Sequence, residues 1–158
     1  MKTLSLERFS CNQNNQKNNI TIKAPKRLKP IEIKTMPYPG FPTDLQQIFG
    51  AMLTTAKGTS VIVENIFENR YKYMTELKRM GAKVTIEGKT SVIKGVKKLS
   101  CANVQSQDLR GGAALVLAAL TAKVKSKISH IEYILRGYEK LDEKLTKLGA
   151  SIVLEEGE

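Results

Sequence analysis

Four short segments place charged side chains where helices are expected to begin. Residues 39–44 (PGFPTD) put the carboxylate of Asp44 in the first turn of a helix, where the positive end of the helix dipole favours its ionised form. Residues 108–110 (DLR) hold the matching place later in the chain. Residues 67–70 (FENR) and 136–139 (RGYE) lie at expected strand-to-helix junctions. Each segment alone is typical of a helix cap or a surface ion pair. Because repeat geometry gathers such junctions at one end of a unit, we expect them to form a shared site.

The sequence lacks the residue patterns of a phosphate-binding loop, a metal site or a disulfide framework. Gly88-Lys89-Thr90 ends like a phosphate-binding loop, but Lys83 stands where that loop needs its opening glycine. His130 is the one histidine, is expected in a strand and has no second metal ligand near it, which favours a structural role. The two cysteines, Cys11 and Cys101, form neither a disulfide framework nor a metal-binding pattern. We therefore expect no metal and no cofactor, and a reduced cytoplasmic protein.

The charge of the chain does not indicate a nucleic-acid or membrane protein. The formal net charge of the 158 residues is +11, of which residues 1–34 carry +6. Aromatic residues make up only 6%, and no basic run is interleaved with stacking aromatics as in nucleic-acid modules. The longest small and apolar run, residues 111–122, is shorter than the ~20 residues that cross a bilayer. We interpret the excess charge as a lysine-rich solvated surface, with nucleic acid and membrane excluded as partners.

Periodicity predicts alternating strands and helices after a polar head at residues 1–19, which we expect to be flexible. Residues 20–23, 31–33, 60–64, 84–86 and 91–94 are expected strands. A helix is expected to begin at Thr43, where Thr43 and Gln46 fit a capping box, and to end at Gly58. A second helix is expected over residues 67–80, with Gly81 as its C-terminal cap.

An internal repeat organises residues 20–158 as one domain. Residues 77–84 (LKRMGAKV) reappear as residues 145–152 (LTKLGASI), and residues 43–45 (TDL) correspond to residues 107–109 (QDL). Each copy reads helix, strand, helix, Gly-Ala, strand, so the repeats run over about 35–97 and 98–158. Repeats of this size bury their apolar faces against each other.

The second copy contains a helix without a polar face. Residues 111–120 (GGAALVLAAL) are apolar around the whole circumference, and such a helix is surrounded by protein. Its small residues let other elements approach its axis. The repeat therefore favours an α/β fold with helices inside and strands outside.

Five ordered motifs resemble the UDP-N-acetylglucosamine enolpyruvyl transferase family. They are residues 38–44 (YPGFPTD), 64–70 (ENIFENR), 79–82 (RMGA), 108–113 (DLRGGA) and 136–139 (RGYE). The resemblance runs from about Ile20 to Glu158. It implies a partial inside-out α/β barrel of βαβαββ repeats, about two of them here. The implied reaction moves enolpyruvyl from phosphoenolpyruvate to the 3-hydroxyl of UDP-N-acetylglucosamine in peptidoglycan synthesis.

The resemblance also assigns roles to residues. Asp44 matches the carboxylate beside the sugar hydroxyl, a proposed base. Arg110 and Arg136 match arginines that bind the phosphoenolpyruvate anions, a task that suits a bidentate guanidinium. These three are the expected catalytic residues, and the expected substrate-binding residues are Thr43, Asp44, Ile66, Glu68, Arg70, Arg110 and Arg136.

The chain departs from the family pattern by missing segments and by two substituted positions. The family's first domain, with its catalytic cysteine loop, has no match, and neither Cys101 nor Cys11 falls where that cysteine is needed. The first repeat of the second domain is absent or reduced to residues 20–34. Val124 replaces an expected turn glycine, and Leu135 an expected aspartate. The chain thus looks like the C-terminal portion of the enzyme, and we expect no catalysis by it alone.

Two interpretations remain open at this point. In the first, the chain is a fragment or half-enzyme that needs the missing N-terminal catalytic half. In the second, it is a non-catalytic, stand-alone repeat protein of the same fold that interacts with other molecules. Two repeats leave apolar edges uncovered, so self-association is expected in either case unless the partner half covers them.

Overall fold

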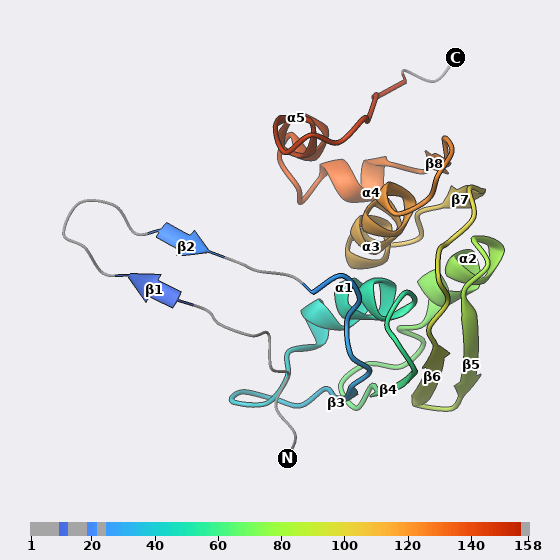
Figure 1. Ribbon diagram of the computed structural model, residues 1–158. Helices are drawn as coiled ribbons and strands as arrows, with labels where there is room; N and C mark the ends of the chain where they lie inside the picture. Colours follow the sequence, from blue (N-terminus) through green and yellow to red (C-terminus); the bar gives the residue numbers. More distant parts are fainter. Residues whose placement is uncertain (1–9, 13–18, 22–24, 156–158) are drawn as a thin grey trace.

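The computed structural model describes residues 10–12, 19–21 and 25–155 (Figure 1). Strands β1 (Ser10–Asn12) and β2 (Asn19–Thr21) pair antiparallel with each other. The rest of the expected head lies outside the described residues. The remaining elements are β3 (Glu32–Lys34), α1 (Thr43–Leu53), β4 (Thr59–Val63), α2 (Lys72–Arg79), β5 (Lys83–Glu87), β6 (Thr90–Lys94), β7 (Asn103–Gln105), α3 (Leu109–Leu120), β8 (Lys127–Ser129), α4 (Glu132–Leu135) and α5 (Leu141–Lys147).

The first unit is a four-stranded mixed sheet with helices α1 and α2 packed on it. Its strand order is β3-β4-β6-β5, with β3 parallel to β4 and the other two pairs antiparallel. Alternate residues of β4 and β6 point into the core, and Ile62 and Ile93 are fully buried there. The expected strands at 60–64, 84–86 and 91–94 therefore form, because alternation of buried and exposed side chains matches the two-residue period of a strand.

Helix α1 begins where the sequence predicts, but its predicted capping box is wrong. Pro42 is the N-cap residue and makes no side-chain cap hydrogen bond. The Thr43 hydroxyl instead donates to Glu64 Oε2 at 2.9 Å, and the Gln46 side chain is fully buried. A tertiary hydrogen bond thus replaces the local one. The helix ends at Leu53, several residues before Gly58.

Helix α2 is shorter than predicted. It covers Lys72–Arg79, whereas residues 68–71 form a turn in which Asn69 has a φ of 55°. The amides of Ile66 and Phe67 donate to the Glu64 carboxylate, so the chain turns here before a helix can start. The predicted cap at Gly81 is confirmed: its φ is 84°, and the amide of Ala82 donates to the carbonyl of Leu77.

The second unit repeats the parallel strand–helix–strand arrangement of the first. Strands β7 and β8 pair in parallel and are connected through α3, as β3 and β4 are connected through α1. The correspondence then stops, since the expected strand around Ile152 is absent from the described residues 151–155. His130 follows β8 with a φ of 56° rather than lying inside a strand. The partial inside-out barrel of about two repeats remains a prediction.

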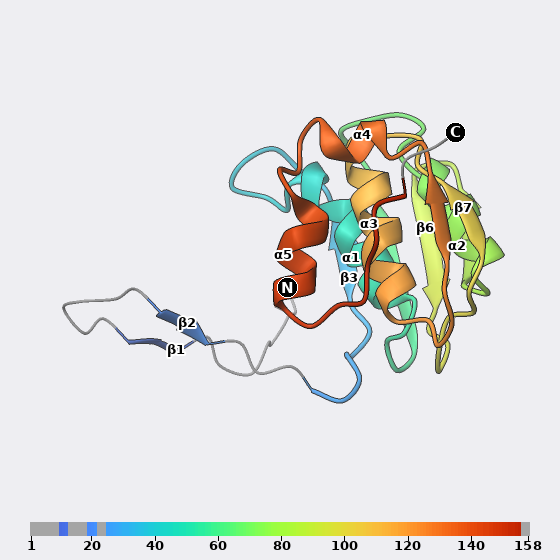
Figure 2. The ribbon, with the colours of Figure 1, turned by 90° about the horizontal axis from the view of Figure 1, so that it is seen from above.

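Helix α3 is buried, as its composition predicts. Seven of its residues from Gly111 to Ala118 are buried, and it packs along α1 (Figures 1 and 2). A side chain at Gly112 would meet Ile134 at 2.6 Å, so glycine permits the close approach of α4. This packing of α1 against α3 joins the two units.

The C-terminal surface carries exposed apolar side chains. Helix α5 has no buried residue, and Leu148 and Val153 are 84% and 76% exposed. Self-association through such residues stays a prediction. No helix in the described part of the chain combines the length and apolar character needed to cross a membrane.

A buried contact between α1 and α2 gives a first test of this packing. A methyl group at Gly50 would overlap the Tyr73 hydroxyl, which has no hydrogen-bond partner among the described residues. We expect Gly50→Ala to lower the free energy of unfolding by about 1–3 kcal/mol in urea titrations. Tyr73→Phe alone should leave stability unchanged or raise it, since it removes an unsatisfied buried hydroxyl.

The two changes should also be coupled. In the Tyr73→Phe background Gly50→Ala should cost clearly less than in the wild type, because the overlapping oxygen is gone. Equal costs in both backgrounds would contradict the described contact.

Candidate active site

A pocket of about 420 Å³ lies where the two units meet. Five of the seven predicted site residues line it, and Thr43 and Ile66 do not. The lining residues are Asp44, Gln47, Phe67, Glu68, Asn69, Arg70, Lys72, Gln107, Asp108, Leu109, Arg110 and Arg136. Their segments begin α1, precede α2, begin α3 and follow α4, so the helix-start segments singled out in the sequence do converge.

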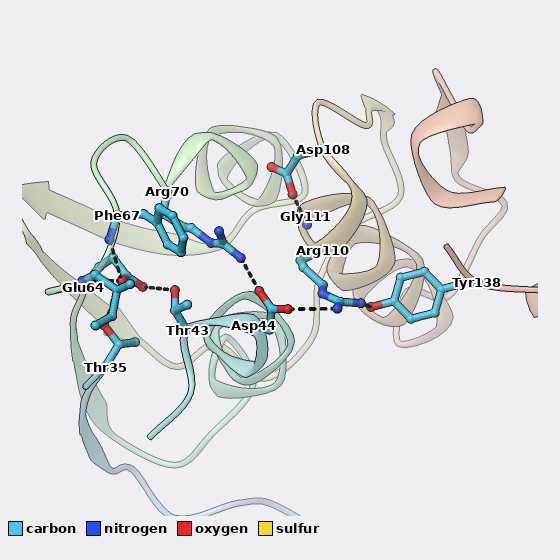
Figure 3. A network of polar contacts seen from close by, with 11 residues as sticks. Thr35, Thr43, Asp44, Glu64, Phe67, Arg70, Asp108, Arg110, Gly111 and Tyr138 are labelled. Carbon is cyan, nitrogen blue, oxygen red and sulfur yellow. Dashed lines mark hydrogen bonds and ion pairs between the residues drawn. The ribbon is translucent and has the colours of Figure 1, made fainter. Parts of the chain in front are cut away.

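Asp44 is the electrostatic centre of this pocket (Figure 3). Its Oδ1 accepts a hydrogen bond from Arg70 Nη2 at 2.7 Å, and its Oδ2 accepts one from Arg110 Nη2 at 2.9 Å. Its side chain remains 53% exposed. The hydrogen bond from Arg110, followed by the charges of Arg110 and Arg70, holds the pKa of Asp44 below its usual 3.8 despite some desolvation. Asp44 is therefore ionised at neutral pH.

Arg110 is held from two sides. Its Nη1 donates to the Tyr138 hydroxyl at 3.0 Å, and its guanidinium carbon lies 5.6 Å from the centre of the Tyr138 ring. The hydrogen bond to Asp44, then that to Tyr138, raises the pKa of Arg110 above its already high value. Asp108 caps the same helix by accepting from the Gly111 amide at 2.7 Å. Arg110 thus projects from a fixed helix start.

Arg70 lies on the opposite side of Asp44. Its guanidinium carbon lies 4.7 Å from the centre of the Phe67 ring. In the amide orientation that satisfies both groups, Gln47 Oε1 accepts from Arg70 Nε at 2.7 Å, and Gln47 Nε2 donates to the carbonyl of Thr43 at 3.1 Å. Arg70 is therefore oriented by an aromatic ring and an amide as well as by Asp44.

Arg136 is the least restrained of the predicted cations. It follows α4 directly and lies with its guanidinium carbon 5.5 Å from the centre of the Tyr133 ring. Among the described residues it forms no ion pair, in contrast to Arg70 and Arg110. A guanidinium at the pocket wall without a carboxylate partner is suited to an anionic ligand.

Sequence reasoning missed three residues that hold the site. Gln47 falls among apolar helix positions, and Tyr138 lies within a recognised motif without an assigned role. Glu64 directly follows β4. Each acts through a hydrogen bond to a residue distant in sequence, which no local pattern reveals. A signal in the sequence exists for two of them, because Glu64 lies within the motif of residues 64–70 and Tyr138 within that of residues 136–139.

The geometry supports anion binding beside a carboxylate. Arg70, Lys72, Arg110 and Arg136 line the pocket with Asp44, Glu68 and Asp108. Guanidinium groups bind phosphate or carboxylate through paired hydrogen bonds, and an ionised carboxylate such as that of Asp44 can accept a proton from a hydroxyl. No group of three or more His, Cys, Asp or Glu residues that could hold a metal ion occurs in residues 25–155.

Solved structures place the fold among enolpyruvyl transferases. The crystal structure of the enolpyruvyl transferase NikO from Streptomyces tendae matches 80% of this chain and 29% of its own, with a TM-score of 0.74 and 29% identity. The EPSP synthase of Acinetobacter baumannii matches 75% of this chain at a TM-score of 0.50 and 20% identity, a likeness of fold alone.

The chain belongs to the EPSP synthase family, whose model, described as EPSP synthase (3-phosphoshikimate 1-carboxyvinyltransferase), matches residues 3–145. Within this family it is similar to proteins named UDP-N-acetylglucosamine 1-carboxyvinyltransferase, as the sequence motifs predict. That of Thermodesulfovibrio yellowstonii is 56% identical over 135 residues, 85% of this chain and 32% of the relative. That of Desulfofundulus thermocisternus is 53% identical over 137 residues, 87% of this chain and 56% of the relative. The chain thus spans about a third to a half of these relatives.

Removing the Asp44 charge should strengthen anion binding. In Asp44→Asn, inorganic phosphate no longer competes with a carboxylate for Arg70 and Arg110. We expect its Kd to fall by at least about tenfold, since a charge-assisted hydrogen bond contributes ~1.5–3 kcal/mol. Arg110→Gln should raise the Kd. Chemical-shift titration of the chain with phosphate measures both.

Asp142→Asn is the matched control, because it removes the same charge from α5, away from the pocket lining. An equal gain in phosphate affinity in Asp142→Asn and Asp44→Asn would show that only net charge matters and would contradict the site.

Proposed function

We propose that this chain forms the C-terminal part of an enolpyruvyl transferase. Its substrates would be phosphoenolpyruvate and UDP-N-acetylglucosamine, and its pathway the synthesis of peptidoglycan in the cytoplasm. Relatives at 50–56% identity carry the corresponding name. The observation that carries the proposal is the pocket in which Asp44 lies between Arg70 and Arg110, residues 26 and 66 positions away in sequence.

In the proposed reaction, the 3-hydroxyl oxygen of the sugar bonds to C2 of phosphoenolpyruvate. An acid protonates C3 as this bond forms. Loss of a proton from C3 then restores the double bond while the bond from C2 to the phosphate oxygen breaks and inorganic phosphate leaves. Asp44 accepts the hydroxyl proton as a general base. Arg110 and Arg136 hold the phosphate and carboxylate groups, where their charge also stabilises the transition state. Arg70, Glu68, Thr43 and Ile66 are assigned to the wall that binds the UDP-sugar.

The ion pairs of Asp44 bear on its role as a base. With both oxygens accepting from arginines, the pKa of the carboxylate is lowered and its affinity for a proton is weak. An anionic substrate competes with Asp44 for Arg110. Binding of that anion would therefore free Oδ2 and raise the proton affinity of Asp44. Substrate binding and activation of the base are coupled in this mechanism.

The described pocket lacks one part that the reaction requires. Transfer needs an acid that protonates the alkene carbon, yet no cysteine is among the lining residues and Cys101 is exposed elsewhere. We assign this acid, and the opposite wall of the cleft, to a segment that corresponds to the part of the relatives' sequences that this chain does not match. Without them the reactants are not oriented and water is not excluded.

We expect no phosphate release from phosphoenolpyruvate and UDP-N-acetylglucosamine by the 158-residue chain alone. A chimaera in which this chain replaces the matching segment of the Thermodesulfovibrio yellowstonii relative should turn over. In that chimaera Asp44→Asn should lower kcat by at least ~100-fold, the typical contribution of a general base. Arg136→Gln should lower kcat/KM, and phosphate release measures each rate.

Asp142→Asn serves again as the control and should retain activity. Two results would count against the proposal. One is an inactive chimaera that folds; the other is turnover by the isolated chain that survives Asp44→Ala.

A further inference from the structure

Glu64 is a buried carboxylate outside the pocket lining. Only 1% of its surface is exposed, and no Lys or Arg among the described residues pairs with it. Burying a charge is costly unless hydrogen bonds compensate. Four donors do so here: Thr35 Oγ1 at 2.8 Å, Ile66 N at 2.9 Å and Phe67 N at 3.2 Å bond to Oε1, and Thr43 Oγ1 at 2.9 Å bonds to Oε2.

These donors come from three separate segments (Figure 3). Thr35 follows β3, Thr43 begins α1, and Ile66 and Phe67 lie in the turn after β4. The Thr35 hydroxyl also accepts from the Asn65 amide at 2.9 Å, which closes the network. One carboxylate thus fixes the start of α1 relative to the turn that precedes α2.

Each side of the Asp44–Arg70 ion pair is attached to this network. Asp44 is the residue after Thr43, so the hydroxyl bond to Glu64 fixes the helix turn that carries Asp44. Phe67, whose amide donates to Glu64, has its ring against the guanidinium of Arg70. The distance between Asp44 and Arg70 therefore depends on Glu64, whose hydrogen bonds go to other residues.

We propose that Glu64 is a positioning residue for the Asp44–Arg70 pair, and through it for the transfer reaction, a role that rests on the proposed function. Its task is to accept hydrogen bonds from three segments at fixed geometry. The negative charge itself is not required, because a glutamine keeps one carbonyl oxygen for the two amides and the Thr35 hydroxyl. Its amide nitrogen donates to the Thr43 hydroxyl oxygen, whereas Oε2 of Glu64 accepts from that hydroxyl.

The pKa of Asp44 reports on this positioning. It is lowered by the hydrogen bonds and charges of Arg110 and Arg70, which depend on short distances. If Asp44 shifts away from the arginines, its carboxylate loses stabilisation and the pKa rises toward 3.8. A loss of global stability alone, without a shift of Asp44 in the folded state, does not move it.

We would measure the Asp44 pKa by carboxyl-carbon NMR in the full chain. Glu64→Leu and Thr43→Val should raise it, whereas Glu64→Gln should leave it near the wild-type value. Thr54→Val is the control, because it removes another buried hydroxyl bond at the far end of the same helix. It should not shift the pKa. If Glu64→Leu does not fold, Thr43→Val decides.

The same variants in the active chimaera test the link to catalysis. Glu64→Leu should lower kcat by on the order of 100-fold, as a misplacement of about 1 Å can, and Glu64→Gln should restore most of it. An unchanged Asp44 pKa in both Glu64→Leu and Thr43→Val would overturn the proposal, as would a loss of kcat in Glu64→Gln equal to that in Glu64→Leu. An inactive wild-type chimaera would refute the proposed function only, since the NMR result stands without turnover.

Discussion

The site depends on one carboxylate shared by two guanidinium groups. Asp44 reaches Arg70 of the first unit and Arg110 of the second, so a single side chain links the helix starts of both. Because its side chain is half exposed, these ion pairs contribute only about 0–1 kcal/mol each to stability. The units are held together instead by the packing of α1 along the buried helix α3. The ion pairs therefore set the electrostatics of the pocket more than they stabilise the fold.

Elements whose order follows from local patterns could be predicted from the sequence. Three such features are the start of α1 at Thr43, the buried helix α3 and the left-handed conformation of Gly81. Each follows from the apolar periodicity of its segment or from the type of residue at that position. The errors occur where tertiary hydrogen bonds override local preference. The Thr43 hydroxyl donates to Glu64 and therefore does not form the predicted capping box. The amides of Ile66 and Phe67 also donate to Glu64, and the helix expected from residue 67 begins only at Lys72. The strand expected around Ile152 does not form, and α5 beside it buries no residue, so a repeat in sequence did not ensure a repeat in packing.

The same distinction applies to the site. Five predicted residues meet at the pocket because the segments that begin α1 and α3, precede α2 and follow α4 lie near each other: Asp44, Glu68, Arg70, Arg110 and Arg136. Thr43 and Ile66, which were predicted to bind substrate, do not line the pocket; the Thr43 hydroxyl and the Ile66 amide donate to Glu64. Gln47, Tyr138 and Glu64 could not be found from the sequence, since their partners lie on other segments. Motifs predicted the charged groups, and the structure adds the residues that orient them.

The sharing of Asp44 between the two units is best tested by its own titration. Arg110 gives the largest contribution to lowering the Asp44 pKa, because it donates a hydrogen bond to the charged form. Carboxyl-carbon NMR of the wild type should give a pKa below 3.8, and the value should rise toward 3.8 in Arg110→Gln. A wild-type pKa at or above 3.8 that does not change in Arg110→Gln would contradict the account, because the carboxylate would then not bridge the two units.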